Sequence, residues 1–238
     1  MTHPLDHPVL ASLTGVHASM ALTKGAAARY PADICPFAAL PDQPDAADWA
    51  DAAGLTEPDE QVAFPGLRDS PPPGWELVWL GTVVQLVAGT GDIGQPDSEA
   101  VPLGPDDVPE MLSLTERTRP GPFRPRAIEF GGYLGIRREG RLIAMAGERL
   151  RPPGWTEISA VCTDPQWRGQ GLASRLIRAV AAAVTARGDT PFLHAVSDNT
   201  TAIRLYLELG FTYRRDLTFP LLRRGAGGPA TPAETRQP

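Results

Sequence analysis

The chain has 238 residues, of which 42% are hydrophobic and 21% charged, an ordinary composition for one large or two small globular domains. Its net charge of −6 is unevenly divided. Residues 1–100 carry fourteen acidic and three basic side chains, and residues 101–238 carry fourteen acidic and nineteen basic ones. This split makes a nucleic acid a poor partner for the whole chain, but it allows a small anionic ligand on the second half.

The sequence points to the cytoplasm. Two cysteines, Cys35 and Cys162, are too few for a disulfide framework. The first twenty residues lack the basic and apolar runs of a signal peptide, and no stretch approaches the ~18–20 apolar residues of a membrane span. We therefore expect a cytoplasmic protein with no membrane partner.

The first hundred residues predict five elements, in the order helix, strand, helix, strand, strand. Their expected ranges are 9–22, 34–40, 46–55, 61–64 and 75–87. This order loosely repeats the closing half of the region that follows, so the acidic N-terminal region could be a degenerate copy of it. No glycine-rich phosphate loop occurs here, and residues 89–105 predict a linker.

Residues 101–224 have a clearer pattern, which predicts helix, three strands, helix, strand, helix and a last strand. The expected ranges are a helix after Gly104, strands at 133–138, 142–149 and 156–163, a helix from 172, a strand at 191–196, a helix at 200–209 and one bent strand or two at 211–222. This is an α/β (α+β) domain with helices crossing a mixed, mostly antiparallel sheet. Residues 225–238 are expected to form a disordered tail.

The sharpest local feature is a loop with two glycines, Gly169 and Gly171, between a buried strand and a helix. Glycines let the backbone approach an anion closely, and the first helical turn directs its free amides and positive dipole end toward it. Arg168 adds a fixed charge, so a pyrophosphate would fit. A plain strand–turn–helix connection with tightly packed glycines is the alternative.

Three motifs in fixed order favour the first interpretation: EISAVCT at 157–163, QWRGQGLA at 166–173 and DNTTAIRLYLELGF at 198–211. Over residues 102–222 the sequence therefore resembles the GCN5-related N-acetyltransferase (GNAT) superfamily and, within it, the FR47-like subgroup. A Rossmann site is disfavoured because it needs a third glycine and a later acidic residue. A Walker loop is excluded because the chain has no Gly-Lys-Ser/Thr.

The resemblance implies acetyl-CoA as the co-substrate, whereas the expectation of no metal comes from the residues themselves. It implies that the strand carrying Val161 separates from its neighbour, that the pantetheine arm binds in the gap, and that an amide near Val161 polarises the thioester carbonyl. The loop amides would then hold the pyrophosphate. The coenzyme-binding residues implied in this way are Val161, Cys162, Thr163, Arg168, Gly169, Gln170, Gly171, Leu172, Ala173, Ser174 and Asn199.

The resemblance also implies catalytic roles. Tyr206 lies where the family commonly places a tyrosine that protonates the departing CoA thiolate; packing of its ring under the sheet is the alternative. Asn199 would contact the pantetheine, or it would only cap a helix. For the general base, Glu157 is our candidate, because strand alternation places it on the face of Ser159 and Val161, and Glu148 is its rival. Either carboxylate could instead be a solvated residue or the partner of an arginine.

The acceptor side is less defined. The family builds an acceptor wall at residues 118–126, where Phe123 lies among arginines that could select an acidic acceptor; a solvated loop is the alternative. Phe123 and Glu148 are the residues expected to contact the substrate. An acidic wall from the first hundred residues would instead favour a cationic amine. His194 is expected to be a core residue, and no cluster has the spacing of metal ligands.

The predicted function is transfer of an acetyl group to a primary amine on a small molecule or peptide. The alternative is a non-catalytic module that binds acyl-CoA or a protein partner. A homodimer is left open.

Overall fold

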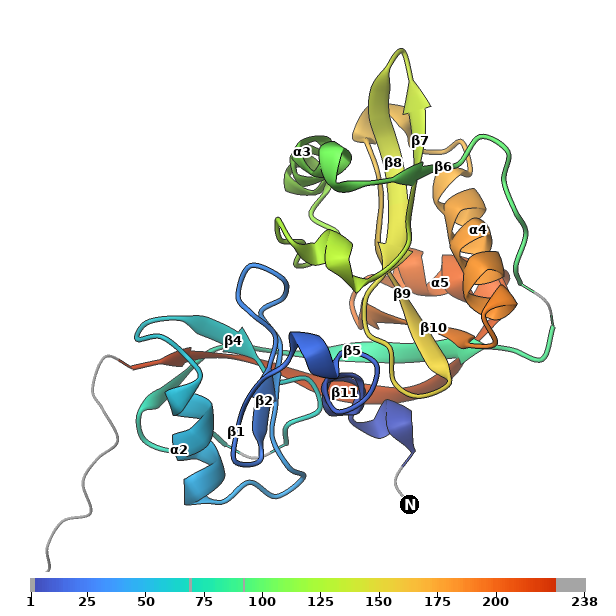
Figure 1. The fold of residues 1–238 in the computed structure, drawn as a ribbon. Coiled ribbons are helices and arrows are strands. Elements are labelled where there is room, and N and C mark those ends of the chain that lie inside the picture. Colours follow the sequence, from blue (N-terminus) through green and yellow to red (C-terminus); the bar gives the residue numbers. More distant parts are fainter. Residues whose placement is uncertain (1–2, 69, 92, 226–238) are drawn as a thin grey trace, which may run out of the picture.

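The protein is described from a computed structural model covering residues 3–68, 70–91 and 93–225. Its centre is an eight-stranded sheet in the order β4-β11-β5-β10-β9-β8-β7-β6, in which only β9 and β10 are parallel among the described strands (Figure 1). The strands of this sheet are β4 (Gln61–Ala63), β5 (Trp75–Ala88), β6 (Val101–Leu103), β7 (Tyr133–Arg138), β8 (Arg141–Glu148), β9 (Trp155–Thr163), β10 (Thr190–Val196) and β11 (Phe211–Arg224). A second sheet contains β1 (Leu22–Lys24), β2 (Ala27–Arg29) and β3 (Ala38–Ala39). The mixed, mostly antiparallel sheet expected from the sequence is confirmed.

Helices cover both faces of the large sheet. The α-helices are α1 (Pro8–Leu13), α2 (Ala46–Gly54), α3 (Val108–Thr118), α4 (Leu172–Ala186) and α5 (Thr200–Glu208). The apolar face of α4 packs with residues of α5 and with one face of the central strands in the largest core cluster. On the other face, α3 forms a core with β7, β8 and β9, and the N-terminal segments form another beside it (Figure 1). No helix among the described residues is long and apolar enough to cross a bilayer.

Strand β5 joins the N-terminal region to the rest of the chain. It pairs along its whole length with β11, and its residues Val83–Val87 also pair with β10. Gln85, in the middle of β5, is completely buried, and it belongs to a run of four consecutive buried residues, Val83–Leu86, as expected where both faces of a strand are covered. The division of the chain into residues 1–100 and 101–224 stays a prediction. The hydrogen bonds of β5 with β10 and β11 place strands from both parts in one sheet.

Several expected elements have different bounds in the structure. The helix expected over 9–22 ends at Leu13, and only two residues of the strand expected over 34–40 pair with β2. The expected linker contains β6, which pairs with β7 at the edge of the sheet. The last expected strand is a single one with two irregularities in its register, and most of the expected tail, residues 226–238, lies outside the described residues.

Candidate active site

A cavity of about 810 Å³ lies between the two parts of the chain. Its lining comes from β9, β10, α5 and the loop before α4, together with Pro8, Phe37, Pro65, Trp79 and Val83 from the first hundred residues. The N-terminal region therefore forms one wall of this cavity. That wall contains no carboxylate among the described residues, so the acidic wall considered from the sequence is not present there.

Strand β9 carries a β-bulge at the cavity. Ala160 has a φ of +54°, and the register with β8 shifts so that Met145 lies opposite Cys162 while Gly147 lies opposite Ser159. The extra residue changes the alternation of side chains. Val161 packs with Ile158 in the α4 core, while Cys162 packs in the α3 core. The expectation that Glu157 and Val161 share a face is therefore wrong, because the bulge lies between them.

The bulge occurs where β9 and β10 separate. Their parallel pairing covers only Thr190–Phe192 against Trp155–Glu157. Beyond Glu157, β10 continues beside β5, and the edge of β9 that faces β10 has no described strand partner. Val161, Cys162 and Thr163 line the cavity at this gap. Backbone amides and carbonyls along such an edge are free to bind an extended ligand.

The two-glycine loop opens onto the same cavity. Gly169 and Gly171 have φ angles of +77° and +71°, a region that favours glycine, and each has open space where a Cβ would lie. Gly171 is also the N-cap of α4. The lining includes every residue of the expected loop set from Arg168 to Ser174 except Gln170. Arg168 donates a hydrogen bond from Nε to the Thr163 carbonyl at 3.3 Å, which ties the loop to the end of β9.

Tyr206 and Asn199 both line this cavity from α5. The Tyr206 ring packs edge-on against Phe211, and burial raises the pKa of its hydroxyl to about 12, so the hydroxyl stays protonated near neutral pH. Asn199 caps the helix, because its Oδ1 accepts a hydrogen bond from the Ala202 amide at 3.1 Å. The cap confirms one of the two roles considered for Asn199, and its place in the lining leaves the other as a prediction.

Glu157 is fully buried and held by several donors. Its carboxylate accepts two hydrogen bonds from Arg149, at 2.8 and 2.7 Å, one from His194 Nδ1 at 2.7 Å and one from the Leu150 amide at 3.3 Å. Burial alone would raise the pKa of this carboxyl, but Arg149 and then His194 outweigh it and hold the pKa well below its usual range. Such a carboxylate is a weak proton acceptor, which disfavours Glu157 as the direct base.

The tautomer of His194 follows from its neighbours. Gln85 Oε1 accepts a hydrogen bond from Arg214 at 2.8 Å, so Gln85 Nε2 is the donor to both His194 Nε2, at 3.0 Å, and the Leu5 carbonyl. His194 Nε2 therefore accepts, and Nδ1 carries the proton that is donated to Glu157. The expectation of a hydrogen-bonded core histidine agrees with this geometry, although the ring also lines the cavity.

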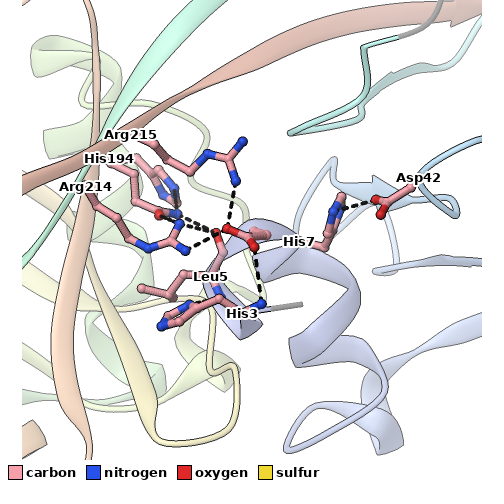
Figure 2. Close-up of polar contacts among 9 residues, drawn as sticks. His3, Leu5, His7, Asp42, His194, Arg214 and Arg215 are labelled. Carbon is pink, nitrogen blue, oxygen red and sulfur yellow. Dashed lines mark hydrogen bonds and ion pairs between the residues drawn. The ribbon is translucent and has the colours of Figure 1, made fainter. Parts of the chain in front are cut away.

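The N-terminal segment supplies further partners of this polar network. Asp6 accepts hydrogen bonds from Arg214 at 2.6 Å and Arg215 at 2.7 Å, and His7 pairs with Asp42 at 2.5 Å (Figure 2). Burial alone would raise the pKa of Asp6, but the two arginines outweigh it and lower the pKa to about 2. These contacts fix the segment before α1, whose Pro8 lines the cavity.

The two residues predicted to contact the substrate lie elsewhere. Glu148 pairs with Arg187 at the end of α4 through contacts of 2.9 and 2.8 Å and does not line the cavity. Phe123 packs edge-on against Tyr133 and borders a separate hollow beside α3. From the predicted acceptor wall, residues 118–122 do line the cavity.

Sequence reasoning missed a row of aromatic residues in the lining. Phe37, Trp79 and Phe219 are far apart in the sequence and belong to no motif, and Trp79 and Phe219 come together only because β5 pairs with β11. Arg149 lies over the Phe37 ring, with its Cζ 5.0 Å from the ring centroid.

The described lining is cationic. It contains Arg119, Arg149, Arg168 and Arg204, whereas its only carboxylate is Glu208, which lies 3.7 Å from Arg204. Among the described residues, no three His, Cys, Asp or Glu side chains are grouped to hold a metal ion.

Comparisons with known proteins agree with this geometry. Residues 133–219 match the model of the FR47-like protein family. A solved structure of a protein from the GNAT acetyltransferase family of Novosphingobium aromaticivorans is 38% identical, with a TM-score of 0.87 over 94% of this chain and 100% of that one.

Curated relatives match over shorter segments. The N-alpha-acetyltransferase RimI of Mycobacterium tuberculosis is 37% identical over 82 residues, which are 33% of this chain and 51% of that protein. An uncharacterised Mycobacterium leprae protein is 31% identical over 129 residues, 48% of this chain and 35% of that protein. The chain thus spans about half the length, or less, of the curated relatives it matches.

Proposed function

Because the chain belongs to the GNAT superfamily of N-acetyltransferases, we propose that it transfers the acetyl group of acetyl-CoA to a primary amine by direct attack in a ternary complex. The observation that carries this proposal is the gap between β9 and β10, which opens onto the same cavity as the two-glycine loop. A coenzyme A substrate also fits the cytoplasmic location expected from the sequence.

The cavity suits acetyl-CoA at its loop end. The open space around Gly169 and Gly171 leaves the loop backbone accessible, and Arg168 and Arg204 supply positive charge for phosphates. We propose that the pyrophosphate binds to this loop and that the pantetheine arm lies along the free edge of β9. The thioester would then lie beside Val161, at the bulge.

The chemistry assigned to this chain is positioning and charge stabilisation. The amine nitrogen attacks the thioester carbonyl carbon, the carbon–sulfur bond breaks, and the thiolate leaves. The backbone amide of Val161 stabilises the negative charge that develops on the carbonyl oxygen, an effect of about 3–4 kcal/mol in other enzymes. The nitrogen loses one proton to solvent water as it becomes the amide. Tyr206 gives its hydroxyl proton to the thiolate and is reprotonated from solvent, so the protons balance.

No free carboxylate at the cavity accepts a proton from the amine among the described residues. Glu208, in the lining, lies beside Arg204, and Glu157, which is buried outside the lining, is bound to Arg149. We propose that Glu157 positions Arg149 and His194, and that the amine enters as the free base. An α-amine, with a pKa of about 7.7–8.0, is neutral near pH 7.5 far more often than a lysine side chain with a pKa of about 10.4. The name of the RimI relative, an N-alpha-acetyltransferase, supports an α-amine acceptor.

The test is release of free CoA thiol from acetyl-CoA with peptides that carry either a free α-amine or only a lysine side chain. We expect thiol release that depends on the α-amine and rises with pH through the acceptor's own pKa. Gly171→Ala should weaken acetyl-CoA binding in calorimetry, because φ there is +71°. Gly154→Ala is the matched control, since Gly154 has a φ of +77° and open space but lies in a distant turn.

The non-catalytic alternative makes the opposite prediction. Such a module would bind acetyl-CoA, with the same sensitivity to Gly171→Ala, but it would release no thiol with any amine. That outcome would refute the proposed transfer while leaving the coenzyme site intact.

A further inference from the structure

An aromatic row leads from the exposed edge of β5 to the buried base of the cavity. The Trp79 ring packs edge-on against Phe219 at 6.1 Å, and Phe219 packs edge-on against Phe37 at 5.5 Å. The Arg149 guanidinium then lies over Phe37 at 5.0 Å. All four side chains line the cavity, so the row is a continuous wall of it.

Trp79, the outermost side chain of the aromatic row, lies along β5, the strand that carries it. A Cβ added at Gly81 would come within 1.9 Å of the Trp79 ring, so the indole covers the position where other residues carry a side chain. Trp79 and Gly81 are two residues apart and face the same side of β5. The indole therefore extends toward Val83, the next cavity residue on that face.

The part of β5 that carries Trp79 has a free edge. Pairing with β10 begins at Val83, and a further hydrogen bond runs from the Ser197 amide to the Thr82 carbonyl. From Trp75 to Gly81, no described strand pairs with this edge. The four residues Leu77–Leu80 are 36–59% exposed, an unusual concentration of apolar surface on a strand edge. Free apolar edges bind other strands readily.

We propose that the acceptor is an extended polypeptide with an apolar first residue, whose backbone adds to the free edge of β5 and whose first side chain lies against the aromatic row. This inference rests on the proposed function and names its substrate class. The peptide takes the position in the sheet that β10 occupies further along, antiparallel to β5. Its amino end then lies opposite Gly81, just before Val83, where the free edge ends at the cavity.

Two observations favour this occupant over other amines. The cavity wall near the row is apolar, and among the described lining residues no carboxylate is free of an arginine partner, so a polycation finds no countercharge there. The exposed edge from Trp75 to Gly81 is long enough for several residues of backbone, whereas a small amine would leave it unused. Because Trp79 belongs both to this edge and to the cavity lining, a single extended peptide can contact the edge and the cavity together.

The test measures kcat/KM for acetyl transfer to tetrapeptides that differ only in the first residue, with 2-phenylethylamine and spermidine as small amines. We expect peptides that begin with leucine or phenylalanine to exceed those that begin with aspartate or lysine, and both small amines, by about 10- to 100-fold. Trp79→Ala should lower kcat/KM for the apolar peptides by a similar factor through KM. Tyr213→Ala, which removes an exposed aromatic side chain of β11 outside the lining, is the control and should change it less than twofold.

Other results would overturn the proposal. Equal rates with 2-phenylethylamine would leave acetyl transfer intact but refute the polypeptide acceptor, as would equal effects of Trp79→Ala and Tyr213→Ala. A dimer in sedimentation that Leu80→Lys dissociates would show that a second copy covers the edge, which contradicts the proposal. No thiol release with any acceptor would refute the proposed function itself, and the acceptor with it.

Discussion

Glu157→Gln separates a positioning role from a base role more sharply than any other single substitution. The change removes one negative charge and keeps the shape of the side chain, so Arg149 loses its ionic partner in a buried site. In the folded protein, Arg149 is bound to Glu157 through two nitrogens and is otherwise in contact with the Phe37 ring. The substitution therefore leaves a buried guanidinium without a countercharge.

The expected cost follows from that burial. Removing one partner of a buried ion pair typically destabilises a protein by about 3–5 kcal/mol, because the remaining charge cannot return to water. Replacing both partners, in Arg149→Met with Glu157→Gln, should recover most of this loss, since no unpaired charge remains. The exposed pair of Arg204 and Glu208 provides a comparison, and Glu208→Gln should cost less than about 1 kcal/mol.

Urea unfolding measures these free energies, and the rate of acetyl transfer between pH 6 and 10 measures the catalytic effect. A positioning role predicts that Glu157→Gln lowers the rate by a similar factor at every pH. A base role predicts that the rate recovers at high pH, where the amine is already neutral. Recovery at high pH together with a stability loss below about 1 kcal/mol would refute the positioning role of Glu157.

Two further predictions concern Tyr206 and His17. Tyr206→Phe should lower turnover at least about tenfold with little change in acetyl-CoA affinity, because only the proton donor is lost; unchanged turnover in thiol-release kinetics would show that the tyrosine is only a packing residue. Burial, and then the charge of Arg151, lowers the pKa of His17 to about 4. Because the buried ring is neutral, its contribution to the free energy of unfolding is fully present above about pH 6.5 and decreases as the pH falls toward 4. At pH 5 the loss is about 2 kcal/mol, and urea unfolding of His17→Gln should show a much smaller difference between pH 7 and pH 5; an unchanged difference would contradict this origin.

The sequence was most informative where short-range patterns determine structure. Hydrophobic periodicity predicted helix α4 and the strand before it. The two glycines predicted the loop between them, and both have the positive φ angles that favour glycine. The bounds of β7 were predicted to the residue, because its turn and alternation are local. The three motifs on which the family resemblance rests are short sequence patterns of the same local kind.

Long-range pairing could not be derived in the same way. No local signal predicts that β5 lies between β10 and β11, and this pairing brings Trp79 to Phe219 and Gln85 to His194. The bulge at Ala160 was missed for a different reason, since alanine seldom adopts a positive φ. That single residue moves Val161 to the face opposite Glu157.

The ion-pair partners of the two candidate carboxylates could not be predicted from the sequence either. Glu157 and Glu148 look alike in sequence, each on a strand near arginines, and the structure pairs them with Arg149 and Arg187 respectively. Arg187 is 39 residues from Glu148 along the chain. A pattern-based prediction can propose that a carboxylate is a base, but only the fold shows which cation neutralises it.

The most direct test of acetyl transfer in this cavity is CoA thiol release from acetyl-CoA, measured with and without a peptide that has a free α-amine and an apolar first residue. We expect release that requires the peptide, together with acetylation of its α-amine in mass spectrometry. Tight binding of acetyl-CoA without peptide-dependent release would contradict the claim that this cavity catalyses acetyl transfer.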